Sequence, residues 1–184
     1  MTEVDMNAQI ARFKDLQPTK KSFSKGDIGI PEEAFQIVTA HAIYRLLAPA
    51  ENARKSAKPA VAGEPGLEVV IAVCPPGQGP GLHNHQKTQE IFICMTGRYE
   101  VIWGDKGEHS TILDPCDMVA VPPGVYRRFR NASDVEDAKL LVIVQGSAEH
   151  AFNDIEMDKN LGEEVERRWG NDVRKNFQKV GIHF

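Results

Sequence analysis

Three side chains that can bind a metal ion lie within eight residues of one another. His83 and His85 are two positions apart, and Glu90 follows five residues after the second histidine. Residues two apart in an extended strand face the same side, so both imidazoles would project together. Two imidazoles and one carboxylate that converge from adjacent strands can hold a divalent ion and leave coordination positions open. The sequence therefore predicts a three-ligand metal site.

The residues around this site are expected to form short β-strands joined by turns. Apolar runs at 67–74, 90–95 and 139–144 are typical of strands, and 98–103 alternates polar and apolar residues for most of its length. Glycine, proline and aspartate separate these runs. We expect at least seven strands between about 67 and 145, a spacing that favours a sandwich or a barrel.

The flanking segments have a different character. The apolar residues of Ala8–Leu16 recur at helical spacing, and Pro31 followed by two glutamates indicates the start of a second helix. Near the C-terminus, Leu161–Lys179 carries an apolar residue every four positions, and Gly170 interrupts it. We expect two short helices there, whose apolar stripe covers the barrel or a partner subunit.

Size and composition limit the class of protein. The 184 residues are enough for one domain with a hydrophobic core, and the net charge is −4. The absence of a long basic block argues against a nucleic-acid partner. No apolar run approaches the roughly 20 residues that span a bilayer, and the first 15 or so residues lack an apolar signal core. We expect neither a membrane partner nor secretion.

The cysteines agree with a reducing compartment. The chain has three cysteines, Cys74, Cys94 and Cys116, so they cannot all pair with one another, and none forms a C-x-x-C pair. Buried, reduced thiols in a cytoplasmic protein are the simplest interpretation. Cys94 shares strand parity with Glu90, so its thiol would face the barrel interior and could respond to a nearby metal.

The residues around the predicted site resemble a known family. The spacing Gly77-x5-His83-x-His85-x4-Glu90-x6-Gly97 resembles the first motif of the cupin superfamily at every defining position. Five positions at fixed spacing in a strand-rich context make this resemblance specific.

A second motif is matched with two departures. Pro122-x-Gly124 followed by Asn131 resembles the second cupin motif, but Cys116 stands where that motif usually has glycine. Arg127 stands where the motif usually supplies a fourth metal ligand, a histidine. A guanidinium has no lone pair to offer a metal, so the usual ligand set of three histidines and one glutamate is incomplete.

The resemblance implies an all-β fold, a double-stranded β-helix or jelly-roll barrel. We expect one cupin domain over 1–184, with the barrel core at about 64–146, an N-terminal extension at 1–63 and a C-terminal helical tail at 147–184. Because cupins commonly pair through exposed edge strands, a homodimer is also expected.

Three functions remain open. In the first, His83, His85 and Glu90 bind a divalent metal, with Fe2+, Mn2+, Ni2+ and Zn2+ not distinguished by ligand type. Two imidazoles and a carboxylate are the ligand set of non-haem iron oxygenases, so a dioxygenase-like enzyme that acts on an anionic substrate is the leading prediction. Arg127 would then hold a substrate carboxylate or phosphate and, with Glu90, act in catalysis.

In the second, the metal is absent, and a Glu90–Arg127 ion pair with the two histidines serves proton transfer, as in cupin-like sugar isomerases and epimerases. In the third, the barrel binds a small ligand without chemistry. For any of the three functions, Phe92 and Phe129 are candidate substrate-binding residues. Phe92 shares strand parity with Glu90, and Phe129 shares it with Arg127.

Overall fold

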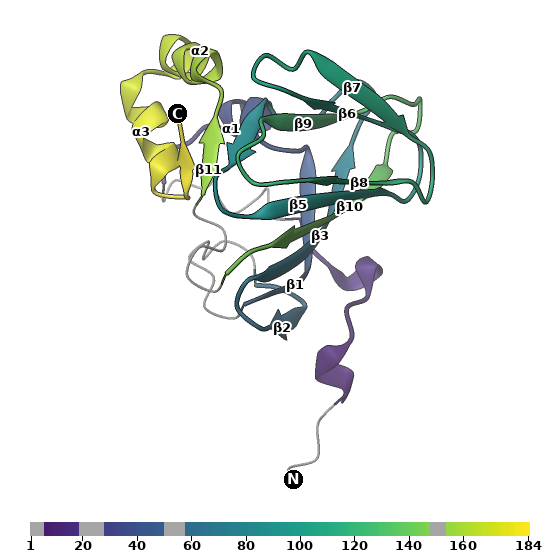
Figure 1. The fold of residues 1–184 in the computed structure, drawn as a ribbon. Helices are drawn as coiled ribbons and strands as arrows, with labels where there is room; N and C mark the ends of the chain where they lie inside the picture. The colour runs from purple at the N-terminus through teal and green to yellow at the C-terminus, as the bar shows by residue number, and fades with distance from the viewer. Residues whose placement is uncertain (1–5, 19–27, 50–57, 148–153) are drawn as a thin grey trace.

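The computed structural model describes residues 6–18, 28–49, 58–147 and 154–184. Two six-stranded sheets face each other and form the barrel (Figure 1). The first sheet has the order β2-β1-β3-β10-β5-β8, and the second has the order β12-β11-β4-β9-β6-β7. The expected all-β barrel of the jelly-roll type with a C-terminal helical tail is confirmed.

The strands alternate between the sheets along much of the chain, as a jelly roll requires. The first sheet contains β1 (Ala42–Pro49), β2 (Val61–Gly63), β3 (Leu67–Cys74), β5 (Gln89–Cys94), β8 (Met118–Val121) and β10 (Ala138–Gln145). The second contains β4 (His83–His85), β6 (Tyr99–Trp103), β7 (His109–Leu113), β9 (Arg127–Asn131), β11 (Ile155–Met157) and β12 (Ile182–His183). The strands expected over 67–74, 90–95, 98–103 and 139–144 are confirmed to within one or two residues, and the eight strands from β3 to β10 agree with the expected number of at least seven.

Three α-helices lie beside one end of the barrel, near β11 (Figure 1). They are α1 (Glu32–Val38), α2 (Lys159–Trp169) and α3 (Asn171–Gln178). The break at Gly170 is confirmed, since this residue has φ 92° and separates α2 from α3. None of the helices in the described residues is long and apolar enough to cross a membrane.

The helix predicted over Ala8–Leu16 is wrong. Two short 3-10 helices, η1 (Met6–Gln9) and η2 (Phe13–Asp15), take its place, and Arg12 between them is extended. The ring of Phe13 packs 4.8 Å from that of Tyr44 on β1, so a tertiary contact outweighs the local helical spacing.

The apolar residues form two clusters. The first fills the barrel between the two sheets and includes Phe92, Tyr99 and Phe129. The second lies between α1, α2, α3 and the C-terminal strands, where Val165 and Phe177 are fully buried. The C-terminal apolar stripe therefore packs within its own chain.

Cys116 occupies the position where the second motif usually has glycine, and its backbone explains that preference. Its φ of 78° makes it the one non-glycine residue in the left-handed region among the described residues. A side chain with a Cβ costs about 1–2 kcal/mol in this conformation. The turn before β8 therefore holds strain that glycine would relieve.

We expect Cys116→Gly to raise the free energy of unfolding by about 0.5–1 kcal/mol, because the relief of strain exceeds the added freedom of the unfolded chain. Urea denaturation under reducing conditions measures this change. Cys116→Ala removes the thiol but keeps the Cβ, so it should leave stability within about 0.5 kcal/mol of the wild type. An equal gain in both variants would assign the effect to the thiol.

Candidate metal centre

Two facing sheets bring the predicted ligands together. His83 and His85 lie on β4 in one sheet, and Glu90 lies on β5 in the other. Strand β5 alternates half-buried and buried residues, so Glu90 points into the barrel together with Phe92 and Cys94. The two strands follow each other in the chain but face each other across the barrel, rather than pairing as neighbours.

The three side chains converge on one carboxylate oxygen. Glu90 Oε2 lies 3.9 Å from His83 Nε2 and 3.8 Å from His85 Nε2. One ligand atom from each residue fits within 4.8 Å of the others, and all three residues are buried. Bonds of about 2.1 Å to one ion need donors about 3–3.5 Å apart, so small side-chain rotations would complete the site. The group could therefore hold a divalent metal.

A backbone carbonyl fixes the orientation of His83. The Nδ1 of this imidazole lies 2.8 Å from the carbonyl oxygen of Gly81. A carbonyl can only accept, so Nδ1 carries the proton, and Nε2 presents its lone pair towards Glu90. Gly81 has no room for a side chain, because a Cβ there would collide with Leu161 of α2.

A threonine and an aspartate fix His85 in the same way. Thr88 Oγ1 donates to Asp154 Oδ2 at 2.9 Å, so its lone pair is left to accept from His85 Nδ1 at 3.0 Å. The other carboxylate oxygen of Asp154, Oδ1, lies 3.3 Å from His85 Nδ1. The backbone N–H of Thr88 also donates to Asp154 Oδ2, at 2.9 Å. Both imidazoles therefore turn Nε2 towards the same oxygen, and outer partners of this kind are typical of metal-binding histidines.

Burial and neighbouring charges set the protonation states. Burial lowers the pKa of His83 to about 4, although Glu90 opposes the shift. Burial favours the protonated form of Glu90, but His85 and Arg127 outweigh it and lower the pKa of that carboxyl. At neutral pH, His83 is a neutral base and Glu90 is ionised, which are the forms that bind a metal.

Arg127 lies beside Glu90 on β9 and is completely buried. Its Nε donates to Glu90 Oε2 at 2.9 Å, and its Nη1 donates to the carbonyl oxygen of Val125 at 3.0 Å. Nη2 is buried and has no hydrogen-bond partner among the described residues. Arg127 was predicted to hold a substrate anion, whereas its partner here is the carboxylate of the ligand set itself.

Comparison with known proteins bears on the family. The sequence of residues 70–144 matches the family described as the cupin domain. The barrel is a cupin domain. No curated protein matches the chain significantly.

Several solved structures resemble the cupin domain. KdgF from Halomonas sp. is 18% identical over 58% of this chain and 82% of its own, with a TM-score of 0.44. A cupin-superfamily sugar phosphate isomerase from Silicibacter pomeroyi is 22% identical over 46% of this chain and 54% of its own, with a TM-score of 0.41. DMSP lyase DddQ from Ruegeria pomeroyi is 24% identical over 60% of this chain and 49% of its own, with a TM-score of 0.45. The family assignment rests on the match of residues 70–144.

A small cavity opens from the metal-binding group of the cupin barrel. Its volume is about 100 Å³, and His83, Glu90 and Phe129 are among the residues that line it. Phe92, the other candidate substrate-binding residue, does not line this cavity. It is fully buried behind Phe129, with the two ring centroids 5.3 Å apart.

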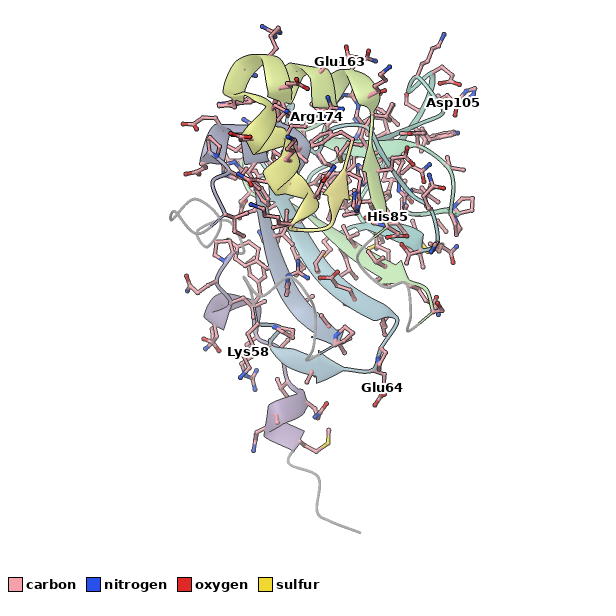
Figure 2. All side chains as sticks on the ribbon, turned by 90° about the vertical axis from the view of Figure 1, so that its left-hand side faces the viewer. Lys58, Glu64, His85, Asp105, Glu163 and Arg174 are labelled. Atoms are coloured by element: carbon pink, nitrogen blue, oxygen red, sulfur yellow. The ribbon has the colours of Figure 1, made fainter. Side chains whose placement is uncertain are left out.

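Sequence reasoning missed the outer partners of the two histidines. Thr88 lies three residues after His85, but nothing in its type or spacing distinguishes it from a turn residue. Asp154 comes from beyond the region that resembles the family, where β11 pairs with β4. Figure 2 places His85 at the end of the barrel that is covered by the C-terminal helices, which carry Glu163 and Arg174. Only the folded chain brings these segments together.

The lowered pKa of His83 makes stability depend on pH. Because the unfolded chain binds a proton near pH 6.5 and the folded chain only near pH 4, the metal-free protein should lose about 3 kcal/mol of stability as pH falls through this window. Glu90, whose pKa is lowered, adds a further loss below about pH 4.5.

Urea denaturation of the metal-free protein between pH 7.5 and pH 4 measures this dependence. His83→Gln should flatten the profile between pH 6.5 and pH 4, whereas His109→Gln, on an exposed strand, should leave it unchanged. A wild-type profile that is already flat in this window would show that His83 titrates normally.

The contacts of Asp154 predict the tautomer of His85. We expect His85 to be protonated at Nδ1 in the metal-free protein at neutral pH, although isolated imidazoles favour Nε2. Asp154→Asn should convert this single tautomer to a mixture, because an amide removes the charge and competes with the donors around it. Nitrogen-15 NMR of labelled histidine measures both populations.

Asp158→Asn is the matched control on the same segment. Asp158 caps α2 by accepting from the backbone N–H of Asn160, and asparagine caps about as well. This variant should keep the wild-type tautomer. A wild-type His85 protonated at Nε2 would contradict the assignment.

Proposed function

We propose that this chain is a metal-dependent cupin enzyme that acts on a small anionic substrate. The observation that carries the proposal is the orientation of the two imidazoles, which each place Nδ1 against a partner outside the site and Nε2 towards Glu90. Both Nδ1–H groups are bound outside the site, so both Nε2 lone pairs meet at Glu90 Oε2. A cluster built only for structure has no need to direct two buried lone pairs at one carboxylate.

A divalent metal held by His83, His85 and Glu90 would act as a Lewis acid, and with iron this ligand set supports oxygenase chemistry. The residues of the chain do the rest. The outer partners hold the imidazoles in position without any need for reorganisation, and the apolar walls of the cavity exclude water from the reacting groups. A dioxygenase-like reaction is the one we favour.

The charge balance of the site favours an anionic substrate. Arg127 and Glu90 form a pair whose net charge is zero, with Nε 2.9 Å from Oε2. A divalent ion would then leave an excess of positive charge in a buried site, which the carboxylate of Asp154 beside His85 offsets only in part, and such an excess is costly. A substrate carboxylate or a similar anion would offset the remainder. Arg127 thus acts on the substrate through the charge of the site, and its Nη2 remains available as a donor.

A metal-free isomerase is the second candidate, and the Arg127–Glu90 ion pair favours it. The guanidinium binds the same oxygen that the two histidines approach, so its charge opposes a cation. In that case, His83, which stays neutral down to about pH 4, would act as a base, and ionised Glu90 would steer the proton.

Metal content separates the two candidates. Protein purified without an affinity tag should contain about one divalent ion per chain by elemental analysis. His83→Ala and His85→Ala should weaken metal binding by at least about 100-fold, because each removes a direct ligand. His109→Ala, which changes an exposed histidine on β7, should retain full occupancy.

Sub-stoichiometric metal in the wild type, unaffected by the ligand variants and not restored by added Fe2+, Mn2+, Ni2+ or Zn2+, would favour the isomerase. If metal is bound, consumption of oxygen with small carboxylic acids tests the oxygenase proposal. Turnover without oxygen uptake would leave a metal-dependent enzyme of another reaction class.

A further inference from the structure

The cavity beside the metal-binding group has a polar side and an apolar side. His83 and Glu90 line one side, and Thr39 is the remaining polar residue of the wall. The other lining residues are apolar: Val38, Ala40, Ile43, Val70, Ala72, Pro80, Phe129, Val142, Ile155, Met157 and Ile182. A molecule in this space would meet the side chains of His83 and Glu90 on one side and, apart from Thr39, hydrocarbon elsewhere.

Much of the apolar wall comes from outside the part of the chain that matches the cupin family. Ile43 lies on β1, Ile155 and Met157 lie on β11, and Ile182 lies on β12. These C-terminal residues also belong to the second apolar cluster, which α1, α2 and α3 complete. The cavity therefore lies where the barrel core meets the flanking cluster, and the flanks limit its size.

The volume restricts the part of a ligand that the cavity can hold. A dry cavity of about 150 Å³ in another protein holds benzene, which has six heavy atoms. The cavity here measures about 100 Å³, so it fits a hydrocarbon body of about four heavy atoms.

The composition of the wall restricts the ligand further. Each buried hydroxyl that finds no partner costs about 1–3 kcal/mol, and Thr39 offers the one hydroxyl of the lining. A sugar or sugar phosphate, with several hydroxyls, would leave most of them unsatisfied. The apolar wall thus argues against polyhydroxylated substrates for this space.

We propose that the site takes short-chain aliphatic monocarboxylates, with the carboxylate at the His83–Glu90 end and the chain against Ile43 and Ile155. This inference rests on the proposed metal-dependent function for the anchoring of the carboxylate. The size limit rests on the walls alone. Ile43 and Ile155 are among the wall residues that limit the accepted chain length.

The experiment measures binding of acetate, butyrate, hexanoate and octanoate to the metal-loaded protein by isothermal titration calorimetry. Butyrate should bind at least about fivefold more tightly than acetate, because two added methylene groups enter the apolar space. Hexanoate and octanoate should bind at least about tenfold more weakly than butyrate, because their chains exceed the cavity.

Ile155→Ala tests the size limit. Ile155 is half-buried, so its truncation should leave the protein folded, and it removes three carbons from the wall. The preferred acid should lengthen from butyrate to hexanoate. Ile93→Ala is the matched control, since Ile93 is also half-buried, lies on β5 and does not line the cavity. This control should keep the wild-type order of chain lengths.

A parallel series of 1-alcohols, from ethanol to octanol, separates this inference from the metal proposal. If no metal binds, the proposed function fails, but the alcohols still report the size limit through the walls. An affinity that rises without a break up to the eight-carbon compounds would overturn the inference. The inference would also be overturned if Ile155→Ala kept the wild-type order of affinities, or if neither the acids nor the alcohols bound.

Discussion

The site depends on the contact between Arg127 and Glu90 in the interior of the barrel. Glu90 Oε2 accepts from Arg127 Nε at 2.9 Å and is also the atom that both imidazoles approach. The guanidinium keeps the carboxylate ionised, and removal of either partner would leave an uncompensated buried charge. One oxygen therefore links the protonation of the site, its capacity for a cation and its net charge.

The position of Arg127 changes what a cupin site can do. A histidine there would add a fourth donor, whereas the guanidinium adds a positive charge and no lone pair. The carboxylate is neutralised from one side before any ion binds. A metal in this site would be held less strongly than by four neutral or anionic donors, but it would attract anions more strongly. Arg127 would therefore weaken the binding of the metal and strengthen the binding of an anionic ligand.

The segments that follow the family region in the chain contribute residues to the candidate site. Asp154, which directly precedes β11, reaches Thr88 and His85, and Leu161 of α2 packs against Gly81, whose carbonyl holds His83. The same segments provide Ile155 and Ile182 for the cavity wall. Residues beyond the stretch that defines the family thus contribute both to the orientation of the ligands and to the wall of the pocket.

The sequence alone predicts the directions of the side chains within each strand of the site. Exact spacing predicts that His83 and His85 face one side, strand parity places Glu90 inward, and position alone identifies Arg127 as the departure. Asp154 could not be predicted, because its pairing depends on how β11 docks on β4, which no local pattern encodes. The cavity wall was missed for the same reason: β12 is two residues long and has no periodicity to detect. The failed helix at Ala8–Leu16 shows the converse, that local spacing yields to a contact such as Phe13 with Tyr44.

The proposed metal-dependent function requires that Glu90 binds Arg127 and a metal ion at the same time. Anomalous diffraction from crystals grown with Mn2+ or Fe2+, collected on both sides of the absorption edge, tests it most directly. We expect one peak between His83 Nε2, His85 Nε2 and Glu90, with Arg127 Nε still hydrogen-bonded to the carboxylate. A peak elsewhere, no peak at saturating metal, or an ion seated only after Arg127 has swung away from Glu90 would contradict it.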